Sequence, residues 1–131
     1  MGKDLSLERI LDKDELDLDN LGLKCLKSGI VVFHYERMAV KLMMPKPVLK
    51  PVIEKLVKAD KLLAQVSLFD AQNTPIKNPK FQKIVENQIK KAEQEIESAE
   101  KEWEKNRPDK TIMRLAKSWL HSQLAIRLAN F

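Results

Sequence analysis

The residues of this chain best suited to metal or nucleophilic chemistry are two histidines and one cysteine. His34 and His121 are far apart in the sequence, and neither has a cysteine or carboxylate at zinc-ligand spacing. There is also no Glu-x-x-His pair of the kind that di-iron helix bundles use. Cys25 has two lysines close by in sequence, but a small residue at the boundary of a core is the simpler interpretation. We therefore predict structural histidines and no metal or other cofactor.

Carboxylates are abundant between residues 93 and 104, where six of the twelve residues are glutamate. On a helix these glutamates would point in several directions instead of converging on one cleft. Acid/base catalysis needs paired groups within hydrogen-bond reach of a substrate, and this spacing does not provide them. The sequence thus predicts no catalytic residue, no small-molecule substrate and no enzyme, although a helical enzyme whose site leaves no motif stays as a third alternative.

Lysines offer the remaining chemistry, which is electrostatic binding of phosphate. Two lysines lie in a proline-rich elbow, and three more lie in the helix predicted after it. The five are Lys46, Lys50, Lys55, Lys58 and Lys61. We call these five the lysine ridge. A ridge of this kind predicts contacts with the backbone of a nucleic acid such as DNA, with little base preference. The alternative is an ordinary solvated surface.

The charges form alternating blocks along a chain of 131 residues with a formal net charge of +5. Residues 1–20 hold seven acids and three bases, and we call this segment the acidic arm. Residues 93–104 are acidic too, whereas residues 21–62 and 105–131 are basic. Such blocks are either solvated faces or surfaces that orient one copy of the chain against another. The acidic arm either packs along the domain or becomes ordered by a neighbour.

The strongest structural signal in the sequence predicts a long charged helix from Asn78 to Asn106. Asn78 suits its cap and Pro79 its first turn, and Pro108 follows its end. Its apolar residues recur at spacings of three and four and form a narrow seam: Val85, Ile89, Ala92, Ile96, Ala99 and Trp103. This seam predicts a helix partner, within the chain or on another copy. Ile96, Ala99 and Trp103, together with the terminal Phe131, are the predicted interaction residues.

Three further helices are predicted around this one. Residues 21–44 are apolar on so much of their circumference that a central helix is expected, although Ile30–Tyr35 would also suit a strand. Gly22 and Gly29 lie seven residues apart and would allow close helix approach. A third helix is expected from Pro51 to about Leu68, then a polar loop from Phe69 to Lys80. The last helix is expected from Asp109 or Thr111 to Phe131.

Composition agrees with an all-α fold. The chain has 3 glycines, 5% aromatic residues and 33% charged residues, which is a poor composition for a sandwich or barrel. We predict a helical bundle of about four main helices over residues 21–131, preceded by the acidic arm, residues 1–20. The acidic start is unlike a signal peptide, and the longest uncharged apolar run is far short of a membrane span. An intracellular, soluble protein without a membrane span is expected.

Pro-bracketed helices, a basic balance, the lack of possible disulfides and an apolar last helix, Thr111–Phe131, together resemble one known group. The chain is similar to the small four-helix-bundle structural proteins of archaeal filamentous and spindle-shaped viruses. The resemblance spans the chain, rests on no motif and carries over no functional residue. It implies a coat-type protein that packs in many copies in a virion and contacts the genome. We thus expect a non-catalytic, self-associating structural protein; the alternative is a small helical adaptor or regulator that binds another protein through the seam.

Overall fold

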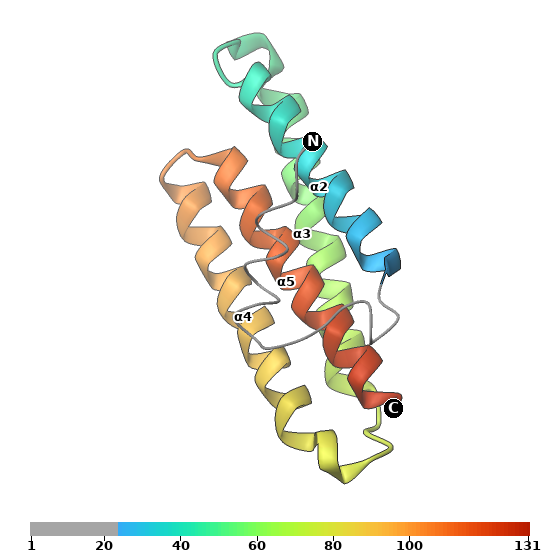
Figure 1. The fold of residues 1–131 in the computed structure, drawn as a ribbon. Coiled ribbons are helices and arrows are strands. Elements are labelled where there is room, and N and C mark those ends of the chain that lie inside the picture. Colours follow the sequence, from blue (N-terminus) through green and yellow to red (C-terminus); the bar gives the residue numbers. More distant parts are fainter. Residues whose placement is uncertain (1–23) are drawn as a thin grey trace.

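The computed structural model describes residues 24–131, with side chains from residue 26 onward. It contains four helices, α2 (Lys24–Met43), α3 (Lys50–Asn73), α4 (Gln82–Glu104) and α5 (Pro108–Ala129), and two short 3-10 turns, Pro47–Leu49 and Pro79–Phe81 (Figure 1). No strand occurs in this part of the chain. The all-α helical bundle is confirmed. The acidic arm, Gly22 and the side chain of Cys25 lie outside the described residues.

Helix α5 is the centre of the bundle. It packs against each of the other three helices, and α4 and α2 lie along opposite sides of it with α3 behind (Figure 1). The largest fully buried side chains include Ile112, Leu115, Leu120 and Leu124 of α5. We predicted that the other helices pack around the one at Asn78–Asn106, and this was wrong. Helix α4 packs through one narrow seam, mainly on α5 and less on α3, whereas α5 is apolar or small around most of its circumference.

Helix α2 is peripheral instead of central, which corrects a second expectation. Its inner side supplies Leu26, Ile30, Phe33 and Val40 to the core. Gly29 permits this packing, because a Cβ atom added there would lie 2.4 Å from Cη2 of Trp119 on α5. The strand alternative at Ile30–Tyr35 is also wrong, since α2 is helical throughout this stretch.

Helix boundaries follow the prolines, with two corrections. Pro108 does not merely follow the long helix; it is the first residue of α5, where its missing N–H costs nothing. Asn106 makes the sharp turn before it, with φ of 58°, a region that asparagine tolerates well. The predicted loop begins too early, because α3 continues from Phe69 to Asn73. The Asn73 amide and the Thr74 hydroxyl donate to the carbonyls of Phe69 and Asp70 and so complete the last turn.

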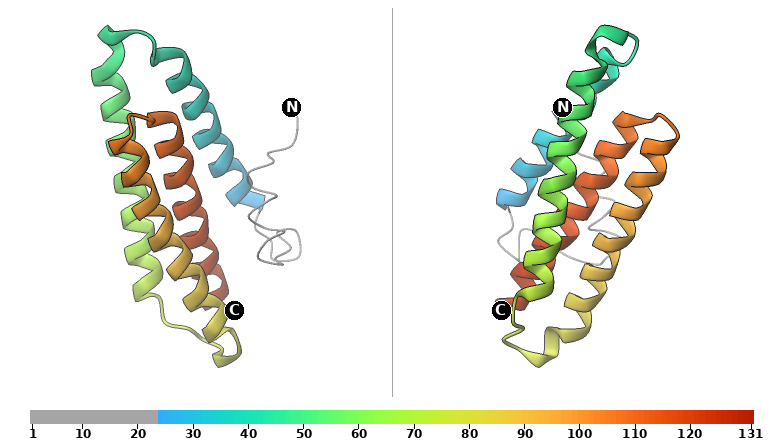
Figure 2. Two further views of the ribbon diagram at one scale, coloured as in Figure 1. Left: turned by 90° about the vertical axis from the view of Figure 1, so that its left-hand side faces the viewer. Right: turned by 180° about the vertical axis from the view of Figure 1, so that it is seen from behind.

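The α2–α3 hairpin projects past the α4–α5 turn, so its tip stands clear of the rest of the bundle (Figures 1 and 2). The core beneath it divides into two apolar clusters. The larger cluster draws on all four helices, and the smaller joins the C-terminal ends of α3 and α5 to the start of α4. The hairpin tip carries the elbow lysines, and the seam of α4 packs into the two clusters.

Candidate interaction surfaces

The structure divides the lysine ridge. Lys46, Lys50, Lys55 and Lys58 are exposed at or near the projecting tip, and Lys61 is half-buried. Lys61 Nζ lies 3.0 Å from Glu100 Oε1 on α4, so this lysine joins two helices of the same chain. The ridge is therefore not one continuous basic surface, and four of its five members remain available at the tip.

Two hollows of about 400 Å³ each lie beside the lysine ridge, between α3 and the C-terminal part of α4. Trp103 lines both. The first has an apolar floor that includes Val57, Ile96 and Leu115, and two lysines and three glutamates line its sides. The second contains Lys46 and Lys50 with Glu54 as its carboxylate. Only the second hollow is lined by more bases than acids, so a polyanion would meet the ridge at the elbow end.

The seam of α4 lies inside the chain over most of its length. Val85, Ala92 and Ala99 are buried, and Ile89 and Ile96 pack against the two core clusters. Ala99, which is 1% exposed, is consequently not an interaction residue on the surface. The small side chain of Ala99 lets α4 pack closely against α5. Trp103 ends the seam at 39% exposure and is the one member that solvent reaches widely.

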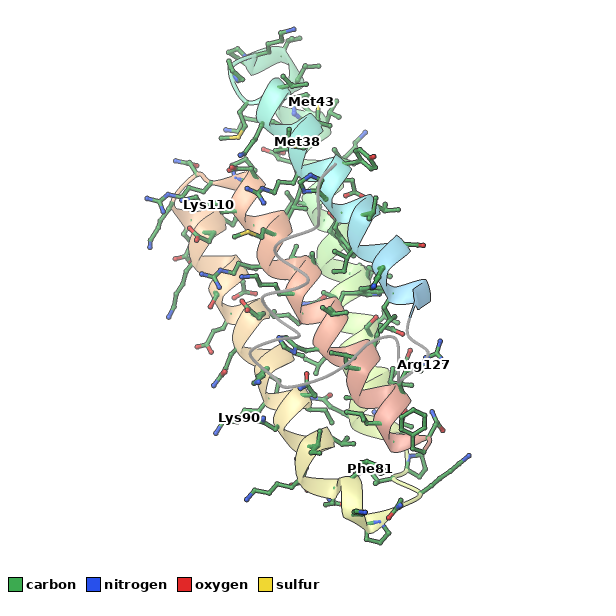
Figure 3. The ribbon with its side chains drawn as sticks, viewed as in Figure 1. Met38, Met43, Phe81, Lys90, Lys110 and Arg127 are labelled. Carbon is green, nitrogen blue, oxygen red and sulfur yellow. The ribbon has the colours of Figure 1, made fainter. Side chains whose placement is uncertain are left out.

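Phe131, the other predicted interaction residue, is 50% exposed. Its ring centroid lies 6.1 Å from that of Phe81, at a tilt of 58°. Phe81 sits at the end of the bundle where the turn before α4 meets the C-terminal end of α5 (Figure 3). Phe131 thus lies against Phe81, which packs on the smaller core cluster, and half of Phe131 remains exposed.

Polar contacts bind α4 to α5 along the seam. The Ser118 hydroxyl donates to the Ala92 carbonyl at 2.8 Å, and His121 Nδ1 lies 2.6 Å from Gln88 Oε1. Burial, with the nearby charges of Lys91 and Lys117, lowers the pKa of His121 to about 4. A neutral ring with its proton on Nδ1 can donate to the amide oxygen, so His121 has a structural role here.

Acids of the 93–104 block also find partners within the chain. Arg114 Nη1 lies 3.0 Å from Glu95 Oε1, and Arg107 Nη1 lies 3.5 Å from Glu102 Oε1. With the bridge from Lys61 to Glu100, three of the six acids are engaged between helices or at a turn. The contacts therefore account for half of the acidic block without a second copy.

Helix α2 meets α3 through two acids. Glu36 of α2 lies beside Asp60 of α3, and Asp60 is buried. Burial, followed by the hydrogen bond and the charge of Glu36, raises the pKa of Asp60 to about 8. Asp60 therefore keeps its proton in the fold at neutral pH, and this contact between α2 and α3 depends on pH in a way that the bonds of α4 do not.

Apolar residues exposed on the outer sides of α2 and α3 were not predicted as a surface. On α2 they recur at helical spacing as Val31, Tyr35, Met38 and Leu42, opposite the side that faces the core, and we call them the α2 stripe. Figure 3 shows Met38 and Met43 near the hairpin tip. On α3 they are Leu62, Leu63, Val66 and Phe69, the α3 stripe. The signal was present in the sequence as a helix with two apolar sides.

Comparison with known proteins adds no family to this description. Neither a protein-family model, nor a curated protein, nor a solved structure matches the chain. Within residues 24–131, no three His, Cys, Asp or Glu side chains gather as a metal site would require. Over the same residues, no helix combines the length and apolar character that crossing a membrane takes. Function is thus argued from the surfaces alone.

Proposed function

We propose that this protein is a non-catalytic structural protein that associates with copies of itself through the α2–α3 hairpin. The observation that carries the proposal is the pair of exposed apolar stripes on its outer sides. Tyr35 is 69% and Leu42 77% exposed on α2, and Phe69 and Leu62 are about as exposed on α3. Apolar patches of this extent are typical of surfaces that another molecule covers.

A second copy is the occupant that the α3 stripe fits best. The stripe spans about two helical turns and is flanked by the uncharged side chains of Gln65, Gln72 and Asn73, with Asp70 at one end and Lys58 and Lys61 at the other. Two such stripes can face each other antiparallel across a two-fold axis near Val66 without opposing like charges across most of the contact. Leu62 of each copy then meets the Phe69 end of the other.

The α2 stripe is a second surface of the same kind on a different helix. A protein with two self-complementary surfaces assembles beyond a closed dimer, because each added copy leaves another surface uncovered. This supports a coat-type role and agrees with the proposed resemblance to the small helical structural proteins of archaeal viruses, with a virion as the location. The alternative, an adaptor or regulator that binds another protein through the seam of α4, has weaker support because most of the seam is buried within the chain.

Electrostatic contact with nucleic acid is the second part of the proposal. The exposed lysines at the projecting tip, Lys46, Lys50, Lys55 and Lys58, favour it. Affinity for duplex DNA should fall with salt at a slope of roughly −0.9 per phosphate contacted. Exchanging Lys46, Lys50 and Lys58 for glutamine should flatten that slope. If the slope is unchanged, or if DNA does not bind at low salt, the tip is only a solvated surface.

Light scattering after size-exclusion chromatography tests the self-association. The wild-type chain should form species larger than dimers. Leu42→Asp should leave dimers joined through α3, and Leu42→Asp with Val66→Asp should give a folded monomer. Gln94→Asp, on the exposed side of α4, is the matched control and should assemble like the wild type. A monomeric wild-type chain at high concentration, or a control that behaves like the stripe variants, would refute the proposal.

A further inference from the structure

The side of α5 that lies between α2 and α4 gathers positive charge from three helices. Arg37 of α2 places Nη1 3.6 Å from Met113 Sδ on α5, and Arg114 of α5 reaches across to Glu95 of α4. Lys91 of α4 and Lys117 of α5 both lie near enough to His121 to lower its pKa. We call Arg37, Lys91, Arg114 and Lys117 the cationic trough. These residues come from α2, α4 and α5, and α2 and α4 lie along opposite sides of α5 (Figure 1).

Two guanidinium groups in the trough have donors that are not satisfied. The Nε atoms of Arg37 and Arg114 are buried and have no hydrogen-bond acceptor in the described part of the chain. Arg37 Nη1 donates to the thioether sulfur of Met113, which is a weak acceptor. Buried N–H groups normally have partners, and carboxylates are the strongest acceptors for guanidinium groups. The trough is therefore suited to a ligand that brings carboxylates.

The chain carries such a ligand next to the trough. Five of the eight residues from Asp12 to Asp19 are acidic, and Leu16 and Leu18 lie between them. Helix α2, which carries Arg37, begins at Lys24. From Lys24 to Arg37 the helix rises about 20 Å, whereas the ten residues back to Asp14 can span up to about 33 Å. The acids of the arm can consequently fold back along α2 as far as the guanidinium groups.

We propose that the acidic segment Asp12–Asp19 of each copy docks in the cationic trough of the same copy, between α2 and α4. Its carboxylates accept hydrogen bonds from Arg37 and Arg114 and pair with Lys91 and Lys117, and its leucines cover apolar side chains of α5. The tether favours the arm over any competing polyanion, because a short linker holds a ligand at about millimolar effective concentration. The arm thereby reserves the trough and directs external polyanions to the lysines of the hairpin tip.

Carbodiimide cross-linking of the full-length protein tests this assignment, because the reagent joins a carboxylate to a lysine amine only when the two touch. Peptides from the arm should be found joined to Lys91 and Lys117, in about tenfold greater yield than to the exposed Lys46 and Lys50, as the effective concentration of a docked arm implies. Mixing ¹⁵N-labelled with unlabelled protein shows whether a link lies within one copy. Equal yields at all four lysines, or links that join labelled to unlabelled copies, would overturn the proposal.

Amide hydrogen exchange of the arm gives a second readout that does not depend on the cross-linker. Lys91→Gln with Lys117→Gln should speed exchange in Asp12–Asp19 about tenfold, since two charged partners are lost. Lys46→Gln with Lys50→Gln removes the same charge from the tip and is the matched control, which should leave the arm unchanged. Unprotected amides in the wild-type arm, or equal acceleration by both variants, count against docking. Neither result depends on whether copies associate through the stripes.

Discussion

Helices α4 and α2 lie on opposite sides of the same central helix, yet they are attached to the bundle in different ways. Helix α4 turns one apolar seam inward, adds the bonds of Gln88 and Ala92 to α5, and keeps its other sides charged. Helix α2 has apolar residues on two opposite sides. Its polar contacts include the acid pair with Asp60 and the weak bond from Arg37. Helix α4 thus completes the bundle, whereas α2 also presents a surface.

The apolar content of a helix therefore does not by itself show how central the helix is. A helix with one apolar stripe is finished once that stripe is covered. In α2 the described helices α5 and α3 cover the inner side, whereas the apolar residues of the outer side stay exposed. Substitutions on the inner side of α2 should therefore lower the stability of the monomer far more than substitutions on its outer side.

The largest effect is expected for Phe33→Ala on the inner side of α2. Phe33 is buried with its ring centroid 5.7 Å from that of Trp119, so truncation leaves a cavity and should lower the free energy of unfolding by about 3–5 kcal/mol. Tyr35→Ala, two residues away on the outer side, should change it by less than about 0.5 kcal/mol in the monomer. Urea denaturation of dilute protein measures both. Similar losses for the two variants would mean that both sides of α2 are structural.

Much of this arrangement could be predicted from the sequence, because local patterns set it. The seam from Val85 to Ala99 recurs at helical spacing and is buried as that spacing suggests. Gly29 marked a close approach, and Trp119 fills the space. These features depend on residues within one helix, whose geometry is fixed by the backbone. Prolines likewise placed the elbows to within a few residues.

The remaining features depend on which helices become neighbours. Nothing local distinguishes the inner side of α2 from its outer side, because both carry apolar residues at helical spacing. The bridge that takes Lys61 out of the ridge depends on α3 and α4 lying side by side. The cationic trough combines residues from three helices that are up to 80 positions apart in the sequence, Arg37 to Lys117. Single-helix periodicity contains no information about such encounters.

The stability of the fold should depend on pH differently through the contact of α2 with α3 and through the contact of α4 with α5. Asp60 keeps its proton in the fold up to about pH 8 but loses it on unfolding above about pH 4, so its contribution to stability falls as pH rises between these values. His121 stays neutral in the fold down to about pH 4, so its contribution falls as pH drops below about 6.5. The two slopes oppose each other below pH 6.5, and above it Asp60 acts alone.

The wild-type protein should therefore lose about 2 kcal/mol of stability between pH 6.5 and 8, at 1.36 kcal/mol per pH unit. Asp60→Asn removes the titrating group and should abolish this loss, while the exposed Asp70→Asn on the same helix should retain it. Thermal or urea unfolding across the pH range gives the measurement. An equal slope in Asp60→Asn would show that the acid pair does not hold α2 to α3.

A smaller effect with an unusual sign is expected at Gly29. Gly29→Ala raises helix propensity by roughly 1 kcal/mol, but its Cβ would overlap the Trp119 ring and cost about 1–3 kcal/mol. The net result should be a mild loss of stability. In a Trp119→Leu background the overlap disappears, so the same substitution should become stabilising. A Gly29→Ala change with the same sign in both backgrounds would contradict the close packing of α2 on α5.

The smallest effect concerns the pairs that tie α2 and α4 to α3. Lys61 and Glu100 have opposite charges at 3.0 Å, but their side chains are 41% and 54% exposed, so water screens the attraction. Exposed pairs contribute at most about 1 kcal/mol, and Lys61→Gln should lower stability by no more than that, with the loss disappearing in high salt. Lys55→Gln, exposed on the same helix, controls for the change in net charge. The acid pair of α2 should behave differently, since Asp60 is buried and its proton, not screening, sets its strength. If Lys61→Gln still lowers the stability in high salt, the contact of α4 with α3 is sheltered from water. Helices α4 and α2 would then be attached to α3 in a similar way.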